Sequence, residues 1–370
     1  MTTPDAWRDP EAAQRLLATL RARTEHAKPI TLMEFCGGHT HAIMRYGLRQ
    51  ALAPAVRLRA GPGCPVCVTP DGDIDAAIAL SHHPDVIVAT FGDLIRVPGS
   101  RTSSQSARAH GADVRVVYSA LDALSLAQQN PDRRVVMLGI GFETTAPTVA
   151  AALLEASERG LANYYVLSMH KRTPPAMRAI LDAGEVRVDG VLGPGHVAAI
   201  VGARAWEFLP RDYRVPCAVA GFEPLDVLQA VYLLVDAIGS GQPRVDNPYA
   251  RGVTADGNRV AQDLLERVFQ VTDAEWRGLG TIPSSGLTLR PEFAAHDARL
   301  AFDLTEPGCA TQTNEAAKGC RCGEILRGVL EPPECARYGR ACTPAHPLGP
   351  CMVSAEGACA AWLRYGGEIE

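Results

Sequence analysis

From residue 29 onward, short apolar runs rich in β-branched residues alternate with longer amphipathic runs. The short runs predict strands, and the amphipathic runs, whose apolar positions recur every three or four residues, predict helices. We expect strands at 29–35, 56–60, 85–91, 114–118, 134–140, 164–169, 188–192 and 216–220. Regular alternation of strand and helix is typical of parallel sheets with helices on their faces.

The same pattern suggests a division of the chain. A turn-forming run, Asn130-Pro131-Asp132, predicts a boundary between α/β domains at 1–130 and 131–240. Residues 241–370 are expected to hold a linker, a helix at 259–271 and a segment in which Cys, Pro and Gly dominate. Ligands of open α/β sheets bind beyond the carboxyl ends of the strands. We therefore predict an α/β fold, with two domains of mainly parallel sheet facing a cleft and a C-terminal cysteine-rich segment.

Composition excludes several classes of function. The chain has 370 residues and a net charge of -5, and no stretch is dominated by Lys and Arg, so a nucleic-acid partner is not expected. The amino terminus lacks an apolar signal core. The longest apolar run, 227–238, contains Asp236 and is too short to span a bilayer. We expect a cytoplasmic protein without a membrane partner.

The eleven cysteines are unevenly spread. Three lie early, Cys217 stands alone in a predicted strand, Cys309 opens the last stretch, and six crowd the end of the chain. Because reducing compartments seldom keep structural disulfides, clustered cytosolic cysteines favour metal or redox chemistry. We expect Cys217 to be a small buried core residue.

Cys36 lies where a predicted strand passes through a Gly-Gly turn into a helix. Backbone N–H groups at a helix start favour the thiolate over the thiol. His39 and His41 follow on the same turn and could add hydrogen bonds or positive charge.

Residues 61–67, Gly-Pro-Gly-Cys-Pro-Val-Cys, repeat this arrangement after the next predicted strand. We expect Cys36, Cys64 and Cys67 to meet in one metal site near the carboxyl ends of the strands. Three thiolates suit either zinc completed by a histidine or a soft, low-spin iron centre. The alternative for each single cysteine is a buried apolar role.

The C-terminal cysteines are the stronger metal signal. Their spacing lacks the paired Cys-x2-Cys knuckles that zinc sites normally show, whereas a [4Fe–4S] cluster tolerates scattered thiolates and needs four. Six are present, namely Cys320, Cys322, Cys335, Cys342, Cys351 and Cys359. The two left over could form a redox-active disulfide beside the cluster, which would make the segment an electron relay. A tail held together by zinc is the alternative.

Two Gly-Phe-Glu turns add candidates for catalysis. Glu143 and Glu223 each follow a predicted strand and begin a helix, and His196 lies in a Gly-Pro-Gly-His turn that resembles residues 61–64. A shared cleft would bring these groups near Cys36. The alternative for both glutamates is a charge that complements a helix dipole.

Several motifs together resemble one family, the hydrogenase maturation factor HypD. They are Cys36-Gly37-Gly38-His39-Thr40-His41, Gly61-Pro62-Gly63-Cys64-Pro65-Val66-Cys67, Gly141-Phe142-Glu143-Thr144-Thr145, Gly193-Pro194-Gly195-His196, Gly221-Phe222-Glu223-Pro224, Gly319-Cys320-Arg321-Cys322-Gly323 and Gly349-Pro350-Cys351-Met352-Val353. The resemblance spans about residues 29–362. Ala120 and Arg172 stand where the family would have proline and leucine, and neither position is a candidate ligand.

The resemblance implies a scaffold, with possible redox activity, for the Fe(CN)2CO unit of [NiFe]-hydrogenases. Such a scaffold holds the iron precursor with a HypC-type small chaperone, whose N-terminal cysteine shares the iron. Cyanide arrives from a HypE-type donor, which obtains it through HypF from carbamoyl phosphate. Cys36, Cys64 and Cys67 match the family's iron-handling cysteines, and His39 and His41 match its adjoining histidines.

The terminal cysteines match the family's [4Fe–4S] region, which is similar to that of ferredoxin:thioredoxin reductase. That analogy assigns Cys322, Cys335, Cys342 and Cys359 as cluster ligands, with Cys320 and Cys351 as the thiol pair.

Three other functions compete with this interpretation. An iron–sulfur thiol-disulfide oxidoreductase would use Cys64 and Cys67 as its exchanging dithiol and would need no chaperone. A zinc-dependent hydrolase would use Cys36, Cys64, Cys67 and His39. A purely structural role is the weakest, because it leaves the thiol-bearing turns unexplained.

Overall fold

The computed structural model describes residues 4–304 and 319–366. Cys309 lies outside this part of the chain. Each of the eight expected strands is present, and all eight pair in parallel. The expectation of an α/β fold with mainly parallel sheets is therefore confirmed.

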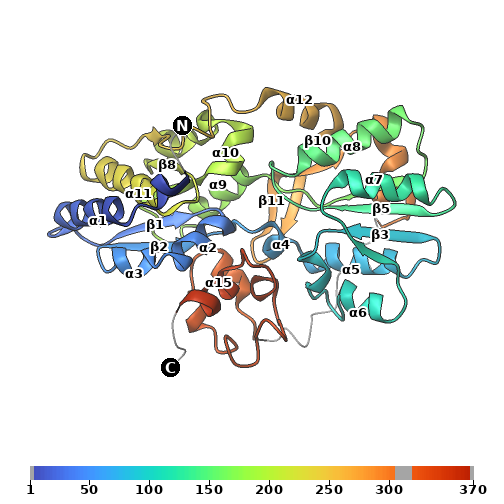
Figure 1. Ribbon diagram of the computed structural model, residues 1–370, viewed down its shortest axis with the longest axis horizontal. Coiled ribbons are helices and arrows are strands. Elements are labelled where there is room, and N and C mark those ends of the chain that lie inside the picture. The colour runs from blue at the N-terminus through green and yellow to red at the C-terminus, as the bar shows by residue number, and fades with distance from the viewer. Residues whose placement is uncertain (1–3, 305–318, 367–370) are drawn as a thin grey trace.

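The first sheet has five strands in the order β2-β1-β7-β8-β9. They are β1 (Ile30–Glu34), β2 (Val56–Ala60), β7 (Gly190–Pro194), β8 (Cys217–Ala220) and β9 (Val245–Asp246). Their apolar side chains pack against α1 (Pro10–Thr24) and α11 (Pro224–Gly239). The sheet occupies the left half of Figure 1.

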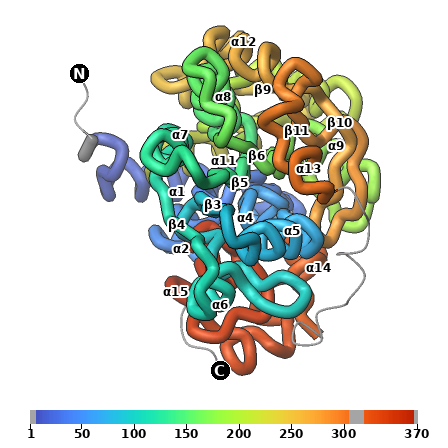
Figure 2. The backbone as a smooth tube through the Cα atoms, turned by 90° about the vertical axis from the view of Figure 1, so that its right-hand side faces the viewer, coloured from blue at the N-terminus to red at the C-terminus, as the bar shows by residue number. Residues whose placement is uncertain are grey.

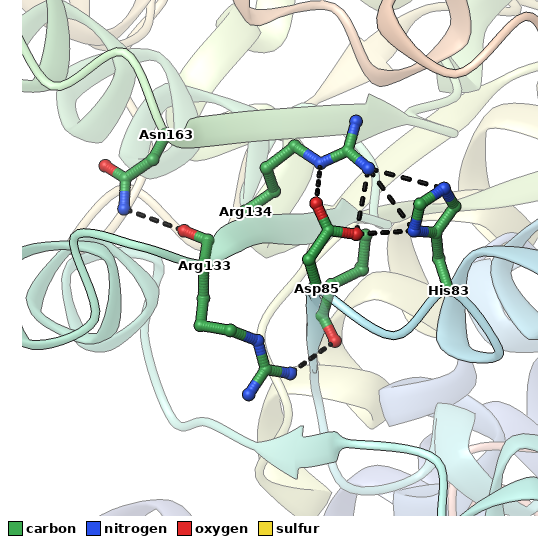
Figure 3. Close-up of polar contacts among 6 residues, drawn as sticks. His83, Asp85, Arg133, Arg134 and Asn163 are labelled. Carbon is green, nitrogen blue, oxygen red and sulfur yellow. Dashed lines mark hydrogen bonds and ion pairs between the residues drawn. The ribbon is translucent and has the colours of Figure 1, made fainter.

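The second sheet has four strands in the order β4-β3-β5-β6. They are β3 (Val86–Thr90), β4 (Val114–Val116), β5 (Arg134–Gly139) and β6 (Tyr164–Ser168). The loops before β3, β5 and β6 are tied together by polar contacts (Figure 3). Arg134 donates to both carboxylate oxygens of Asp85 at 2.8 and 2.9 Å, and Asn163 donates to the Arg133 carbonyl at 2.9 Å.

The two sheets do not divide the chain at residue 130. Strand β5 follows that position and pairs with β3, which precedes it, while β1 pairs with β7. The run Asn130-Pro131-Asp132 is only the short turn between α7 (Ala120–Gln129) and β5. A helix-to-strand turn uses the same residue types as a linker between domains, so composition could not separate the two. The ranges 1–130 and 131–240 therefore do not coincide with the sheets.

Helices cover both sheets and connect their strands. Besides α1, α7 and α11, the described helices are α2 (Gly37–Arg45), α3 (Leu48–Leu52), α4 (Pro65–Val68), α5 (Asp71–Ser81), α6 (Ser104–Ala109), α8 (Ala146–Glu158), α9 (Thr173–Ala183), α10 (Gly195–Val201), α12 (Arg259–Val268), α13 (Ala298–Ala301), α14 (Cys322–Leu326) and α15 (Ala358–Tyr365). None of the helices in the described residues is both long and apolar enough to cross a membrane.

A hairpin, β10 (Phe269–Trp276) and β11 (Gly280–Leu289), was not expected from the sequence. The helix predicted at 259–271 ends at Val268, and the antiparallel pair begins at once. The hairpin lies between the two sheets (Figure 1), where Trp276 stacks on Phe142 with ring centroids 5.9 Å apart. Part of the expected linker, residues 245–246, forms the edge strand β9.

The C-terminal segment lies below both sheets in the two views, and Figure 1 shows it below the middle of the molecule (Figures 1 and 2). It contains α14, α15 and two short 3-10 turns, Pro332–Glu334 and Pro350–Met352. Its buried residues share one apolar core with Phe35, Cys64 and Cys67. The fold thus brings the end of the chain to the thiol-bearing turns of its first third.

Candidate functional site

Cys36 has the position that the sequence predicts. It is the N-cap of α2, with φ -152° and ψ 121°, directly after β1, and its side chain is 0% exposed. The Glu34 carboxylate accepts hydrogen bonds from the Cys36 N–H at 3.2 Å and from the Thr40 hydroxyl. Because it is buried, the pKa of Glu34 is raised to about 8.

The thiol state of Cys36 differs from the expectation. Burial raises the pKa of this thiol well above its ordinary value, the charge of Glu356 raises it further, and the backbone N–H of His39 lowers it by less. The free side chain is therefore a thiol, since loss of solvation outweighs the helix N-terminus. A bound metal ion would be needed to displace the proton.

The two thiol-bearing turns are in contact. Gly37 N–H donates to the Gly63 carbonyl at 3.0 Å, and Gly61 N–H donates to the Glu34 carbonyl at 2.8 Å. A Cβ atom at Gly63 would lie 2.1 Å from the Cys36 nitrogen, so only glycine allows the turns to approach this closely.

The thiols on these turns face different neighbours. Cys36 Sγ lies 3.5 Å from His196 Nδ1, whereas Cys64 Sγ accepts from the Cys67 N–H at 3.3 Å. The Cys67 thiol interacts with the thiols of both Cys351 and Cys64. Within the described residues, no three His, Cys, Asp or Glu side chains are arranged to hold a metal ion. A single site made by Cys36, Cys64 and Cys67 thus stays a prediction.

His196 and His39 flank the ring of Phe222. The centroids of Phe222 and His196 are 5.2 Å apart, and those of Phe222 and His39 are 4.8 Å apart, with interplanar angles of 24° and 29°. His39 Nε2 donates to the carbonyls of Ala220 and Gly221 at 3.2 and 3.0 Å. Burial lowers the pKa of both histidines to about 4, so both rings are neutral near pH 7.

A pocket of about 500 Å³ opens beside His196. Its wall includes Gly38, Arg45, Phe222 and Glu356, and Cys36 itself is not exposed to it. His196 thus lines the pocket and also contacts Cys36 Sγ, which is buried behind the pocket wall.

Two further predicted residues, His41 and Glu223, lie on the same wall. His41 lies edge-on to Tyr365 of α15, at 5.2 Å between centroids. Glu223 is ion-paired with Arg8 at 2.5 Å, and this pairing lowers the pKa of its carboxyl group. Both side chains therefore border the pocket.

Glu143 is not on that wall. Its side chain is 3% exposed and accepts from the Thr173 N–H at 2.8 Å and from the Thr173 hydroxyl at 2.9 Å, at the start of α9. These contacts place the Glu143 carboxyl group at the start of α9 rather than at the helix that follows it, α8. A catalytic role for Glu143 stays a prediction.

The C-terminal cysteines come together. Cys322 Sγ lies 2.6 Å from Cys351 Sγ, and Cys351 also interacts with the Cys67 thiol. Which of these thiols would bind a cluster, and which would form a pair, stays a prediction. Burial raises the pKa of Cys359, and the adjacent thiols of Cys322, Cys320, Cys342 and Cys335 raise it further. None of the ten described cysteines is in a disulfide. The donor set is soft and rich in sulfur, as an iron–sulfur cluster requires.

Sequence reasoning missed Glu34, Phe222 and Glu356. Glu34 reads as one polar position in an apolar strand, and Phe222 was quoted only as part of a Gly-Phe-Glu turn. Glu356 packs on the start of α2, where a Cβ at Gly37 would lie 2.5 Å from its own Cβ. Only the buried charge in β1 was a usable signal, since charged residues are seldom buried without a partner.

Comparison with known proteins matches nearly the whole chain to the family that its motifs resemble. A family model, HypD, described as "Hydrogenase formation hypA family", matches residues 11–366. The hydrogenase maturation factor HypD of Rhizobium leguminosarum bv. viciae is 48% identical, over 98% of this chain and 95% of its own. The hydrogenase expression/formation protein HupD of Azotobacter chroococcum is 48% identical (98% and 96%), and HypD of Escherichia coli K12 is 45% identical (98% and 97%).

These matches define the class first: the chain is a hydrogenase-formation protein. Within that class it belongs to the HypD family of hydrogenase maturation factors.

Proposed function

We propose that this protein holds the iron atom of the Fe(CN)2CO unit of [NiFe]-hydrogenases on the Cys36 thiolate while CN and CO are attached. A HypC-type small chaperone would share the iron, and a HypE-type donor would supply the cyanide. The observation that carries the proposal is the contact between buried Cys36 Sγ and neutral His196, 3.5 Å apart, beside a pocket of about 500 Å³.

The geometry supplies a route for the proton that iron binding must release. Fe(II) replaces the hydrogen of the Cys36 thiol and forms an Fe–S bond. The proton passes by way of the unshared pair of a ring nitrogen on neutral His196, which lies within reach of Sγ, to water in the pocket that His196 lines, because a ring with a pKa of about 4 does not keep it near pH 7. A soft thiolate favours the low-spin Fe(II) that strong-field CN and CO ligands require.

We further propose that the C-terminal segment carries a [4Fe–4S] cluster on Cys320, Cys335, Cys342 and Cys359. Burial raises the pKa of Cys320 and Cys359, and the neighbouring thiols, Cys322 first among them, raise it further, which indicates that the thiols of this segment lie near one another. When bound, the cluster supplies one-electron redox chemistry. Oxidation of Cys322 and Cys351 to a disulfide releases two electrons and two protons.

The contact of Cys67 with Cys351 favours a second function, thiol–disulfide exchange. A Cys64–Cys67 disulfide would be reduced by the Cys351 thiolate through a mixed disulfide with Cys67, and Cys322 would resolve it. The products are the Cys64–Cys67 dithiol and a Cys322–Cys351 disulfide. This step could serve the maturation reaction by keeping thiols near Cys36 reduced.

Infrared spectroscopy on the protein co-purified without oxygen with its small chaperone tests the first proposal. Stretching bands of CN and CO in the complex are the expected result. A complex that contains iron but shows neither band would contradict the assignment. A colourless complex that contains zinc would favour the hydrolase instead.

A further inference from the structure

Three aromatic rings from three different turns form one stack beside Cys36. His39 comes from the start of α2, Phe222 from the turn between β8 and α11, and His196 from the start of α10. The Phe222 ring is in the middle. It also packs on Gly38, where a Cβ atom would lie 3.1 and 3.2 Å from two of its ring carbons.

The two outer rings are held in different ways. His39 is fixed by its two hydrogen bonds to the carbonyls of Ala220 and Gly221. Among the described residues, His196 has a single hydrogen-bonding contact, with Cys36 Sγ, at 3.5 Å from Nδ1 and 3.8 Å from Nε2. A thiol is a weak hydrogen-bonding group, so it orients a ring poorly. The orientation of His196 therefore depends on its stacking against Phe222.

The Phe222 ring is held in its stacking contact with His196. Its far face meets His39, which is anchored to the backbone on either side of the turn. On the next residue, the Glu223 N–H donates to Asp226 at 3.1 Å, and Arg251 holds both oxygens of Asp226 at 2.7 and 2.6 Å. These contacts hold the turn that carries the ring.

We infer that Phe222 is a positioning residue, which holds the His196 ring over the Cys36 thiol and keeps that thiol closed to the pocket until a partner moves the ring. This inference rests on the proposed function, because it takes Cys36 as the thiol that receives iron. Its role in that reaction is to present one ring nitrogen of His196 to the thiol when iron arrives.

The rate at which Cys36 is alkylated in the native, reduced protein measures how open this thiol is to the pocket. The protein is exposed to iodoacetamide for set times, and mass spectrometry gives the fraction of Cys36 that has reacted. Phe222→Leu removes the flat ring and should speed alkylation about five- to tenfold, the worth of one aromatic pair. His196→Ala should have an effect of similar size. The double variant should react no faster than the faster single variant, because both substitutions remove the same barrier. Phe222→Tyr should keep the original rate.

Two controls make the result decisive. Phe208→Leu alters another buried ring, whose contacts are with Arg178 and Tyr213, and should leave Cys36 unchanged. Protection of Cys217, which is buried in the inner strand β8 of the first sheet, reports whether each variant is folded. Should Phe222→Leu fail to fold, Phe222→Met takes its place, with the same expected rise.

A Phe222→Leu or Phe222→Met variant that stays within twofold of the original rate would overturn the inference. Single effects that multiply in the double variant would overturn it too. Missing infrared bands in the unaltered complex would instead count against the proposed function, and the alkylation rates would still decide the role of Phe222.

Discussion

The thiols of Cys322 and Cys351 lie 2.6 Å apart, although 29 residues separate them in sequence. Cys322 opens α14, and Cys351 lies in a short 3-10 turn that packs on α4, the helix that carries Cys67. Under the proposed thiol–disulfide exchange, this contact would make Cys322 the resolving partner of Cys351.

Mild oxidation with diamide should join Cys322 to Cys351, because their Sγ atoms lie 2.6 Å apart and neither cysteine is in a disulfide. Peptide mapping under non-reducing conditions would detect the cross-linked pair. Cys320→Ser should leave this product intact and serves as the matched control. A peptide that joins Cys320 to Cys351 would support the original assignment instead.

Gly63→Ala should destabilise the protein by about 3 kcal/mol or more, since the added methyl group would meet the Cys36 backbone and force the two turns apart. Urea unfolding measures the loss. Gly239→Ala is the control, because a Cβ atom there meets nothing within 4 Å and alanine suits the end of α11. Equal stability of the two variants would show that the turns do not need their close approach.

Glu143→Gln should lower the free energy of unfolding by about 1–3 kcal/mol, because the buried carboxylate loses charge while it still faces Thr173. Thr173→Val removes the same hydroxyl contact, so the two losses should not add in the double variant. Alkylation of Cys36 should be unaffected. A stable Glu143→Gln variant whose complex lacks the CN and CO bands would restore the catalytic role that the sequence suggested.

His170 should make stability fall in acid. Its side chain is 1% exposed, and burial lowers its pKa from 6.5 to about 3. Below about pH 6.5, the unfolded chain therefore binds a proton at His170 that the folded protein does not bind. The resulting loss in the free energy of unfolding is absent above that pH and grows as the pH falls toward 3. At pH 5 the loss is about 2 kcal/mol relative to pH 7.

Urea unfolding at pH 7 and at pH 5 checks this expectation in the His170→Leu variant, where the drop in stability should be smaller than in the unaltered protein by that amount. His39 and His196 add drops of the same sign in both proteins, so the difference isolates His170. His26→Leu, at an exposed position, is the control. An unchanged drop in His170→Leu would mean that His170 does not resist protonation in the folded state.

Most of the strands could be predicted because they are short, buried apolar runs, such as β3 and β8. The strands β2 and β4 alternate apolar residues with arginines, which is the pattern of a half-buried strand. Which strands share a sheet could not be predicted. The pairing of β1 with β7 joins residues that lie about 160 positions apart in sequence, and no local pattern records it. The hairpin was missed because the apolar spacing of α12 continues across Val268 into Phe269.

The site was predictable in its residues and less so in its contacts. Cys36 and His196 can be identified as candidates because reactive residue types stand on Gly-rich turns. The direction of each side chain, however, depends on packing. Cys64 and Cys67 sit on the turn beside Cys36, yet Cys67 faces Cys351. In the Cys-Arg-Cys motif, residues 320 and 322 are chemically alike, and only the backbone decides which of them meets Cys351.

The most direct test of the central claim is the infrared spectrum of the chaperone complex with Cys36→Ala, compared with that of Cys217→Ala. Both substitutions remove one buried thiol from the region of the first sheet, and only Cys36 contacts His196 beside the pocket. The CN and CO bands should disappear in Cys36→Ala and persist in Cys217→Ala. Bands of full intensity in Cys36→Ala would contradict the claim that this thiol holds the iron.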